Sequence, residues 1–366
     1  MKAILSVNTD PIPTPGTARP EIPNRSSLFR GGRGDGQGPA GWRRRAILRL
    51  PGFALFAASP LPAGEAAPPV PRMQVLPLPQ AISSFQLEGR ELTAVHSGPA
   101  DLRPFWYPIL TSKGASLTRM GHPLDPVSHS HHNSVWIAHN DVNGIDFWGD
   151  HAKNQGRIAT QRVDRYDDGD DHAAMQMTNH WLRASDHAVQ LIETRRSEVR
   201  PLEGAKSWLL IIDMEFAAPA GITSTFGSTF FGIIAVRMAK TIGVHDGGGR
   251  ILNSEGHINE ARVFRQPARW CDYSGRITNE ADGFAGITLL NHPGNPQHPT
   301  AFHVRDDGWM GACLAPDKPI TVTGTRKLRV RYGLWVHDGM ATQARSEAQW
   351  KAFTELPMAD LDPKHK

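Results

Sequence analysis

The chain has 366 residues, 39% of them hydrophobic, which is enough for one large domain or two ordinary ones, and its two cysteines exclude a disulfide framework or a cysteine-rich zinc site. Residues 1–66 contain nine Lys and Arg against four Asp and Glu, whereas the remaining residues contain 31 against 32. The formal net charge of +4 therefore comes from the N-terminal segment. The rest of the chain lacks the excess of Lys and Arg that is typical of proteins that bind nucleic acid.

Residues 1–66 are predicted to be a disordered leader that contains a twin-arginine signal peptide. The first forty residues are rich in Pro, Gly, Ser and Arg without a hydrophobic period. Arginines at 43–45 precede apolar residues, and small residues suited to signal-peptidase cleavage follow at 63–67. Prolines interrupt the apolar stretch at 50–61, and nothing later is apolar enough to cross a membrane. We therefore expect a periplasmic or secreted protein without an integral membrane segment after leader removal.

From residue 73 onward, short apolar segments alternate with turns that contain Gly, Pro, Asn and Asp. Strand-like segments lie at 84–96 (two pieces around Gly89), 188–199, 207–216, 251–252, 286–290 and 320–336. One helix is predicted at 344–355, before Pro357. Short strands that do not alternate with helices are typical of sandwiches and barrels. The sequence thus predicts an all-β fold, a large antiparallel β-sandwich with few short helices, as a single domain over residues 73–360.

The densest cluster of titratable side chains lies between His122 and His151, where six of the seventeen histidines occur within thirty residues. In a strand, residues two apart share a face, so His129 and His131 are expected to point into one cavity and His132 away from it. Histidine titrates near neutral pH and can act as a general acid or base. The cluster therefore predicts a functional site.

The second half of the same segment combines a turn with aromatic residues. Asp141 and Asn143, followed by Gly144, can form a turn that aims side chains inward. Trp148 offers a flat apolar face on which a sugar ring can stack, and polar side chains around it can bond to hydroxyls. A polar, histidine-rich cleft with aromatic edges suits a carbohydrate.

Two other interpretations of the cluster remain open. Imidazoles are the commonest metal ligands, so His129, His131 and His139 can hold a transition metal such as copper, zinc or iron, although no helical HExxH motif is present. Alternatively, several of these groups are buried hydrogen-bonding residues that fix loops. The two cysteines, Cys271 and Cys313, likewise allow one disulfide bridge or two buried thiols.

A second cluster lies at 291–299, where three prolines and a glycine predict a stiff loop that carries His292 and His298. The strand that follows places His303 and Arg305 on one face. A third, scattered set offers arginines for oxyanion or carboxylate contacts and carboxylates for acid–base chemistry. It consists of Arg103, Arg119, Arg237, Glu255 and Asp272.

Four segments, in this order, resemble the PmoA-like family, whose members are often labelled methane oxygenase proteins. They are RPFWYP (103–108), GHP with HSHHNSVWIAHNDVNGIDFWGD (121–150), ARWCDYSG (268–275) and LLNHPGNPQHPTAFHVRDDG (290–308). The resemblance implies a sandwich similar to the galactose-mutarotase supersandwich, and an association with sugar-converting enzymes. Where related sequences usually have Asp-His-Pro-His-His, this chain has Ser128-His129-Ser130-His131-His132.

We expect an exported carbohydrate-active enzyme, a carbohydrate isomerase, lyase or hydrolase, that uses acid–base chemistry for epimerisation, β-elimination or hydrolysis. The alternatives are a metal-dependent oxygenase-like protein and a non-catalytic sugar-binding module. The expected partner is a small-molecule or oligosaccharide substrate, with no cofactor in the leading hypothesis and no particular oligomeric state. The predicted catalytic residues are His131, His139, Asp141 and Asp146. The predicted substrate-binding residues are Arg103, Arg119, His122, His129, His132, Asn143, Trp148, Arg237, Glu255, Asp272, His292, His298, His303 and Arg305.

Overall fold

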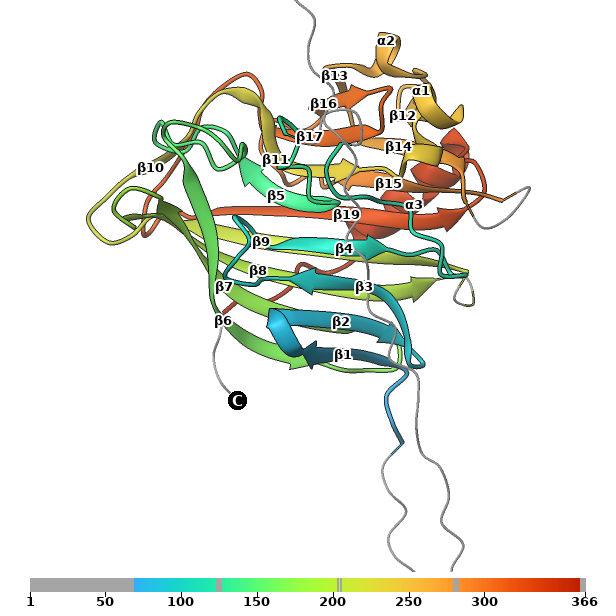
Figure 1. Cartoon of the computed structure of the whole chain (residues 1–366), viewed down its shortest axis with the longest axis horizontal. Coiled ribbons are helices and arrows are strands. Elements are labelled where there is room, and N and C mark those ends of the chain that lie inside the picture. The colour runs from blue at the N-terminus through green and yellow to red at the C-terminus, as the bar shows by residue number, and fades with distance from the viewer. Residues whose placement is uncertain (1–68, 123–126, 203, 205, 279–282, 363–366) are drawn as a thin grey trace, which may run out of the picture. The chain divides into compact units, whose positions relative to one another are not determined.

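The computed structural model describes residues 69–122, 127–202, 204, 206–278 and 283–362. The predicted leader at 1–66 lies outside these residues. Most of the described chain forms β-strands, which assemble into two large antiparallel sheets (Figure 1). The predicted all-β sandwich is therefore confirmed.

The first sheet contains nine strands in the order β1-β2-β3-β4-β5-β11-β17-β16-β13. Their bounds are β1 Met73–Leu78, β2 Ile82–Leu87, β3 Arg90–His96, β4 Phe105–Ile109, β5 Val135–His139, β11 Thr229–Arg237, β17 Trp309–Ala315, β16 Thr300–Arg305 and β13 Gln266–Ala268. Strands from three distant parts of the sequence meet at its centre, because β5 pairs with β11 and β11 with β17.

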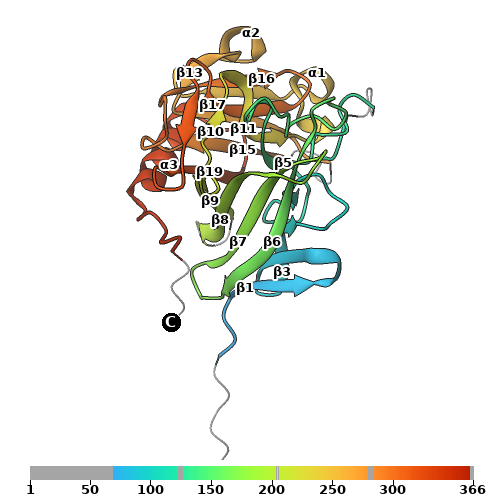
Figure 2. The same ribbon diagram turned by 90° about the vertical axis from the view of Figure 1, so that its left-hand side faces the viewer.

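The second sheet contains eight strands in the order β12-β14-β15-β19-β9-β8-β7-β6. Their bounds are β12 Arg250–Asn253, β14 Trp270–Arg276, β15 Phe284–Asn291, β19 Leu328–Asp338, β9 Ser207–Ala217, β8 Val189–Leu202, β7 Ala173–Arg183 and β6 Gly156–Asp167. A small two-stranded sheet pairs β10 (Ser224–Phe226) with β18 (Ile320–Val322). Figure 2, turned by 90° from Figure 1, shows β6 and β7 of this sheet along their length.

The core lies between the sheets, as the alternation of side chains along each strand requires. In β19, Tyr332, Leu334 and Val336 belong to the large core cluster, whereas Trp335 belongs to a smaller cluster on the opposite face. Helix α3 (Gln343–Glu355) covers that smaller cluster with Phe353. The remaining helices are short: α1 Val244–Gly247, α2 Glu260–Val263, and the 3-10 turns η1 Pro79–Ala81 and η3 Lys240–Ile242.

The predicted segments agree with the observed elements to within a few residues. The segment 84–96 forms β2 and β3 with a turn at Gly89, and 207–216 forms most of β9. The segment 320–336 is divided into β18 and β19 by a turn. The predicted helix at 344–355 is α3, and its first turn is capped by the Thr342 side chain, which accepts a hydrogen bond from the Arg345 amide.

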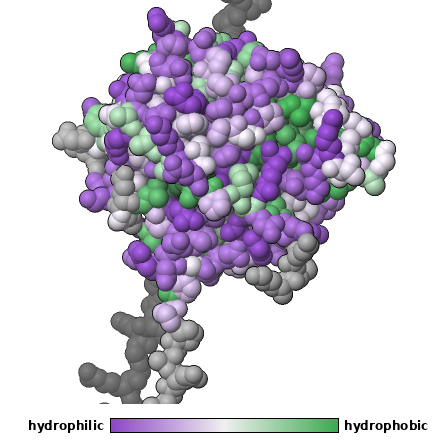
Figure 3. Space-filling view, turned by 180° about the vertical axis from the view of Figure 1, so that it is seen from behind, coloured by the Kyte–Doolittle hydropathy of each residue, from purple (hydrophilic) through white to green (hydrophobic). Residues whose placement is uncertain are grey.

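The two cysteines are both buried free thiols and are not joined to each other. No helix among the described residues is long and apolar enough to cross a membrane. The face seen in Figure 3 is mainly hydrophilic, with smaller hydrophobic areas between the polar ones.

Candidate functional site

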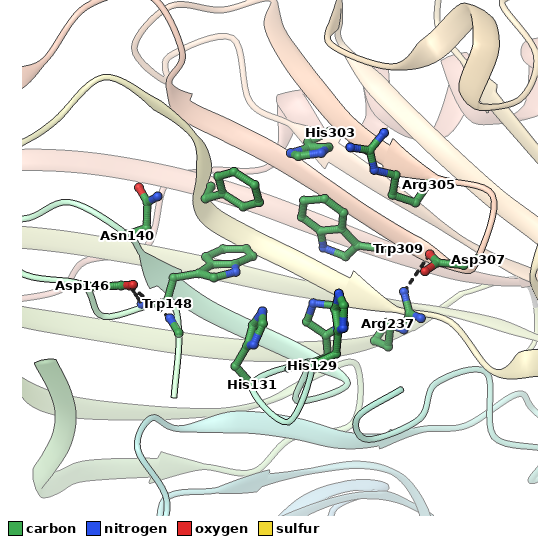
Figure 4. Close-up of a pocket in the computed structure, with 13 residues that line it drawn as sticks. His129, His131, Asn140, Asp146, Trp148, Arg237, His303, Arg305, Asp307 and Trp309 are labelled. Carbon is green, nitrogen blue, oxygen red and sulfur yellow. Dashed lines mark hydrogen bonds and ion pairs between the residues drawn. The ribbon is translucent and has the colours of Figure 1, made fainter. Parts of the chain in front are cut away.

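A cavity of about 430 Å³ lies on the outer face of the nine-stranded sheet, where β5, β11, β17 and β16 are adjacent (Figure 4). Two loops, at 127–133 and 140–149, close it from the side of β5. Its lining residues are His129, His131, His132, Asn140, Asp146, Trp148, Gly149, Phe231, Arg237, His303, Arg305, Asp307 and Trp309. Eight of the predicted site residues are in this set, so the structure brings together segments that are up to 176 positions apart, from His129 to Arg305.

Strand register creates a row of three side chains across the cavity floor. Arg237 on β11 pairs directly with Trp309 on β17, and Trp309 pairs directly with Arg305 on β16. Directly paired residues of antiparallel strands project from the same face with their Cβ atoms about 5 Å apart. The row places one arginine on each side of the Trp309 indole.

Three aromatic rings form one wall of the cavity. Phe231 and Trp309 are stacked, with ring centroids 6.0 Å apart and planes inclined by 10°. Trp148 meets both of them at nearly right angles, with centroid distances of 6.0 Å and 6.1 Å. Phe231 is the most exposed of the three, at 37%. The wall thus offers an apolar surface to a ligand that enters the cavity.

The histidine-rich loop has a turn at 127–131 in place of the expected strand. His132 was expected to point away from His129 and His131, and this is wrong, because all three line the cavity. The two-residue alternation of side chains holds only for extended backbone. The rings of His131 and His132 are 4.4 Å apart, and those of His129 and His132 are 4.9 Å apart.

Arg103 lies beneath this loop, with only 2% of its surface exposed. Its guanidinium donates to the carbonyl of His131 and to the side chain of Asn133 in the first loop. In the second loop it donates to the carbonyls of Phe147 and Gly149 and forms an ion pair with Asp150 at 2.9 Å. Arg103 is not among the lining residues. It holds the two cavity loops together.

Asp146 is a lining residue whose carboxylate shapes the second loop. Its Oδ1 accepts hydrogen bonds from the amides of Trp148 at 2.7 Å and Gly149 at 3.0 Å. This pattern is an Asx-type turn, in which a short side chain replaces a backbone acceptor. The carboxylate therefore orients Trp148.

Asp307 links two arginines and a histidine at one end of the cavity. Its carboxylate accepts from Arg237 Nη1 at 2.9 Å and from His122 Nε2 at 3.1 Å, and its carbonyl accepts from Arg119 Nη2. Burial acts to raise the pKa of the Asp307 carboxyl, but the hydrogen bond to Arg237, the charge of Arg237 and the hydrogen bond to His122 outweigh burial and lower that pKa. Asp307 is therefore a carboxylate at neutral pH. His122 and Arg119 support the site from outside its lining.

Three of the cavity histidines, His131, His132 and His303, are neutral imidazoles at neutral pH because burial lowers the pKa of each. Burial lowers the pKa of His131 to about 4 and that of His303 to about 3. Burial also places the pKa of His132 well below its usual range, and His131 and Arg237 add to the effect. A neutral imidazole has one free lone pair, so it can accept a proton or a hydrogen bond.

The structure does not bring His139 into the cavity. Trp136 of β5 lies on the cavity side, where its ring contacts those of His132 and Trp148, and Asn140, directly after β5, lines the cavity, so His139 faces the opposite way. Its ring lies 5.3 Å from that of Phe226, which in turn contacts Phe216 of the other sheet. His139 therefore points into the sandwich, where burial lowers its pKa to about 4.

Asp141 and Asn143 form the expected turn, but their side-chain oxygens accept hydrogen bonds from backbone amides. Asp141 Oδ1 accepts from the Gly144 amide at 2.9 Å. Asn143 Oδ1 accepts from the Thr225 amide, and its Nδ2 donates to Gln190. Neither residue lines the cavity. They fasten the second loop to the β10 strand.

Four other predicted site residues lie around α3 and the eight-stranded sheet. Glu255 pairs with Arg269 near the surface, and buried Asp272 binds His337 Nε2 at 2.8 Å. His292 Nδ1 accepts from the Gly294 amide. The ring of His298 is stacked on the indole of α3 residue Trp350, with planes inclined by 5°. The 291–299 segment is a loop as predicted, but it does not form a wall of this cavity.

Sequence reasoning missed five lining residues, which are Asn140, Gly149, Phe231, Asp307 and Trp309. Trp309 and Asp307 follow closely after Arg305, in a tight β16–β17 hairpin, and its Asp-Asp-Gly turn was a usable signal. Phe231 had no local signal, because its place depends on the pairing of β11 with distant strands.

Among the described residues, no group of three or more His, Cys, Asp or Glu side chains is arranged to hold a metal ion. The alternative set of His129, His131 and His139 is divided between the two faces of the nine-stranded sheet.

Residues 83–351 match the model of a family described as "Family of unknown function (DUF6807)". The match spans every strand that lines the cavity. No curated protein matches the chain.

Proposed function

The chain belongs to the DUF6807 family, and we propose that it is a carbohydrate-active enzyme that binds a sugar in the cavity and transfers protons with His131. One observation carries the proposal. A single cavity combines the aromatic wall of Trp148, Phe231 and Trp309 with neutral histidines and two arginines. Sugar rings stack on such walls, and their hydroxyls need donors and acceptors around the ring edge.

His131 is the proposed general base. It lies beside the aromatic wall, with its ring centroid 6.4 Å from that of Trp148. Its pKa of about 4, lowered by burial, keeps the imidazole unprotonated at neutral pH. The carbonyl of His131 is held by Arg103, which fixes the backbone from which the ring projects. A positioned neutral base can remove a proton from a sugar hydroxyl or a ring carbon.

Once protonated, His131 itself returns the proton to the product, while the neutral imidazoles of His132 and His303 exchange hydrogen bonds with the bound sugar. The reaction classes that fit are epimerisation, β-elimination and hydrolysis. The resemblance to PmoA-like and mutarotase-like sandwiches supports a sugar as substrate. The predicted twin-arginine export also belongs to this proposal and places the substrate in the periplasm or outside the cell.

A proton-exchange experiment tests the enzyme. The purified chain is incubated in D₂O with a panel of neutral and acidic sugars, and NMR follows deuterium at ring carbons, new double bonds and new reducing ends. We expect one sugar class to change, and His131→Gln to lower its turnover by at least about 100-fold, the usual range for a lost general base. A matched His172→Gln variant, altered on the turn between β6 and β7, keeps full turnover.

Three outcomes separate the candidates. Full turnover by His131→Gln overturns the role of that residue. Tight sugar binding without any product indicates a non-catalytic sugar-binding module. Turnover that disappears with chelation and returns with a transition metal indicates the metalloprotein instead.

A further inference from the structure

Arg237 has an unusual hydrogen-bonding state for a fully buried arginine. The side chain is 0% exposed, and its Nη1 donates to Asp307 at 2.9 Å. Its Nε and Nη2 are also buried, yet neither has a hydrogen-bond partner among the residues that the structure describes. A buried guanidinium donor without an acceptor is costly, so such groups are normally paired.

The two nitrogens concerned form one functional edge. Nε–H and Nη2–H of a guanidinium point in the same direction, and together they match the two oxygens of a carboxylate. Two other buried arginines of this chain use that edge in this way. Arg331 donates from Nε and Nη2 to both oxygens of Asp213, at 2.8 Å and 2.9 Å, and Arg195 donates from the same atoms to both oxygens of Glu193.

Other donors without described partners lie close to Arg237. The indole Nε1 of its cross-strand neighbour Trp309 is one, and Nη1 of Arg119 is another. His132 Nδ1 is a third such atom, on a ring stacked 6.2 Å from that of Trp309. Two of these three groups can only donate. This end of the cavity therefore suits a ligand group that only accepts hydrogen bonds.

The local charge favours an anion. Arg237 and His122 bond to the carboxylate of Asp307, and Arg119 donates to the Asp307 carbonyl, so both arginines lie beside this one residue. Burial and the nearby charge of Arg237 lower the pKa of Arg119 to about 10. Arg305, at the far end of the row, is already paired with Glu260. Asp307 is the carboxylate bonded to Arg237, and the Nε–Nη2 edge of Arg237 has no bonded carboxylate among the described residues, so a further negative charge is favourable at that edge.

We infer that the Arg237 end of the cavity binds a carboxylate of the substrate on the Nε–Nη2 edge of Arg237, and that the substrate is an acidic sugar such as a uronic acid. This inference rests on the proposed function for the sugar part of the ligand. The carboxylate is bound at the Arg237–Trp309 pair, and the sugar ring extends toward Phe231 and Trp148, which places it beside His131.

Calorimetric titration of the full chain tests the inference with D-glucuronate and D-galacturonate against D-glucose and D-galactose. We expect the acids to bind at least 10-fold more tightly than the neutral sugars. The methyl ester of the preferred uronate lacks the negative charge, while the protein is unaltered. We expect the ester to bind at least 10-fold more weakly than the acid. Equal affinity for the acid, its ester and the neutral sugar would overturn the inference.

Substitutions locate the effect on Arg237. R237Q is expected to abolish the preference for the acid, and R237K, which keeps a charge but not the paired donors, to lose most of it. R276Q, at the far end of β14, serves as the matched control and keeps the preference. Retention of the preference by R237Q contradicts the inference. If R237Q does not fold, the ester comparison on the unaltered chain decides.

The outcomes separate this inference from the proposed function. Neutral sugars that bind and react as well as acids sustain the proposed function and overturn the carboxylate site. Simple carboxylates such as acetate that bind through Arg237 as tightly as uronates sustain the carboxylate site and overturn the sugar assignment. Absence of binding by every sugar and acid overturns both.

Discussion

Arg103 and Asp150 form a 2.9 Å ion pair in which the arginine side chain is 1% exposed and the aspartate 16%. The same guanidinium donates to three backbone carbonyls, those of His131, Phe147 and Gly149. One buried cation thus connects the loop that carries the histidines to the loop that carries Trp148. Burial lowers the pKa of Arg103 while Asp150 raises it, so the ion pair offsets part of the cost of burying the charge.

We expect Arg103→Met to destabilise the protein by about 3 kcal/mol, in the range for removing one partner of a buried ion pair. The loss leaves Asp150 and the three carbonyls without their shared donor. Urea unfolding measures the change. The control is Arg72→Met, whose partner Glu88 is 62% exposed, and whose loss is expected to cost under about 1 kcal/mol. An equal loss of unfolding free energy in the two variants would refute the role of Arg103 in holding the two cavity loops together.

The turn role of Asp146 gives a second prediction. Asp146→Asn keeps an oxygen that accepts from Trp148 and Gly149, whereas Asp146→Ala removes it. We expect the Ala variant to lose about 1–2 kcal/mol of stability, the cost of leaving buried donors unpaired, and the Asn variant to lose little. Substrate turnover separates orientation from acid–base chemistry. If Asp146→Asn abolishes turnover without loss of stability, the carboxylate itself takes part in the reaction.

The buried His139 predicts a pH dependence of stability. Its pKa is about 4 in the folded chain, lowered by burial, against about 6.5 for an unfolded histidine. Between these two pH values the unfolded state binds a proton at His139 that the folded state does not bind. The stabilising contribution of the neutral His139 ring is therefore fully present above pH 6.5 and is lost as the pH falls toward 4. Chemical denaturation at several pH values measures the free energy of unfolding. This free energy is expected to fall less steeply with decreasing pH in His139→Gln than in the unaltered chain, by a slope that corresponds to about one proton. A parallel fall in both proteins would contradict the burial of this ring.

The β-sandwich could be predicted because alternating apolar residues and turn residues are local signals. They placed β2, β3, β9 and α3 nearly correctly. The same two-residue period correctly predicted that His303 and Arg305 share a face, because both lie in one regular strand.

The rest of the site could not be read from local patterns. His139 is next to cavity residues in sequence, but which face of β5 meets the other sheet depends on pairing with distant strands. The histidine loop is a turn, so strand periodicity misplaced His132. His298 and His292 face α3 because that helix packs beside β15, a contact that no pattern near those histidines indicates.

Phe231 allows the aromatic wall to be tested apart from stability. It is 37% exposed at the cavity, and Phe284 at the start of β15 is equally exposed. Both Phe→Ala variants remove a similar, half-exposed ring, so we expect similar and small decreases in melting temperature. Only Phe231→Ala is expected to weaken sugar binding, by about 10-fold, because an aromatic contact contributes about 0.5–1.5 kcal/mol beyond the area it buries. Titration of both variants with the preferred sugar gives the comparison, and equal affinities would show that the sugar does not stack on this wall.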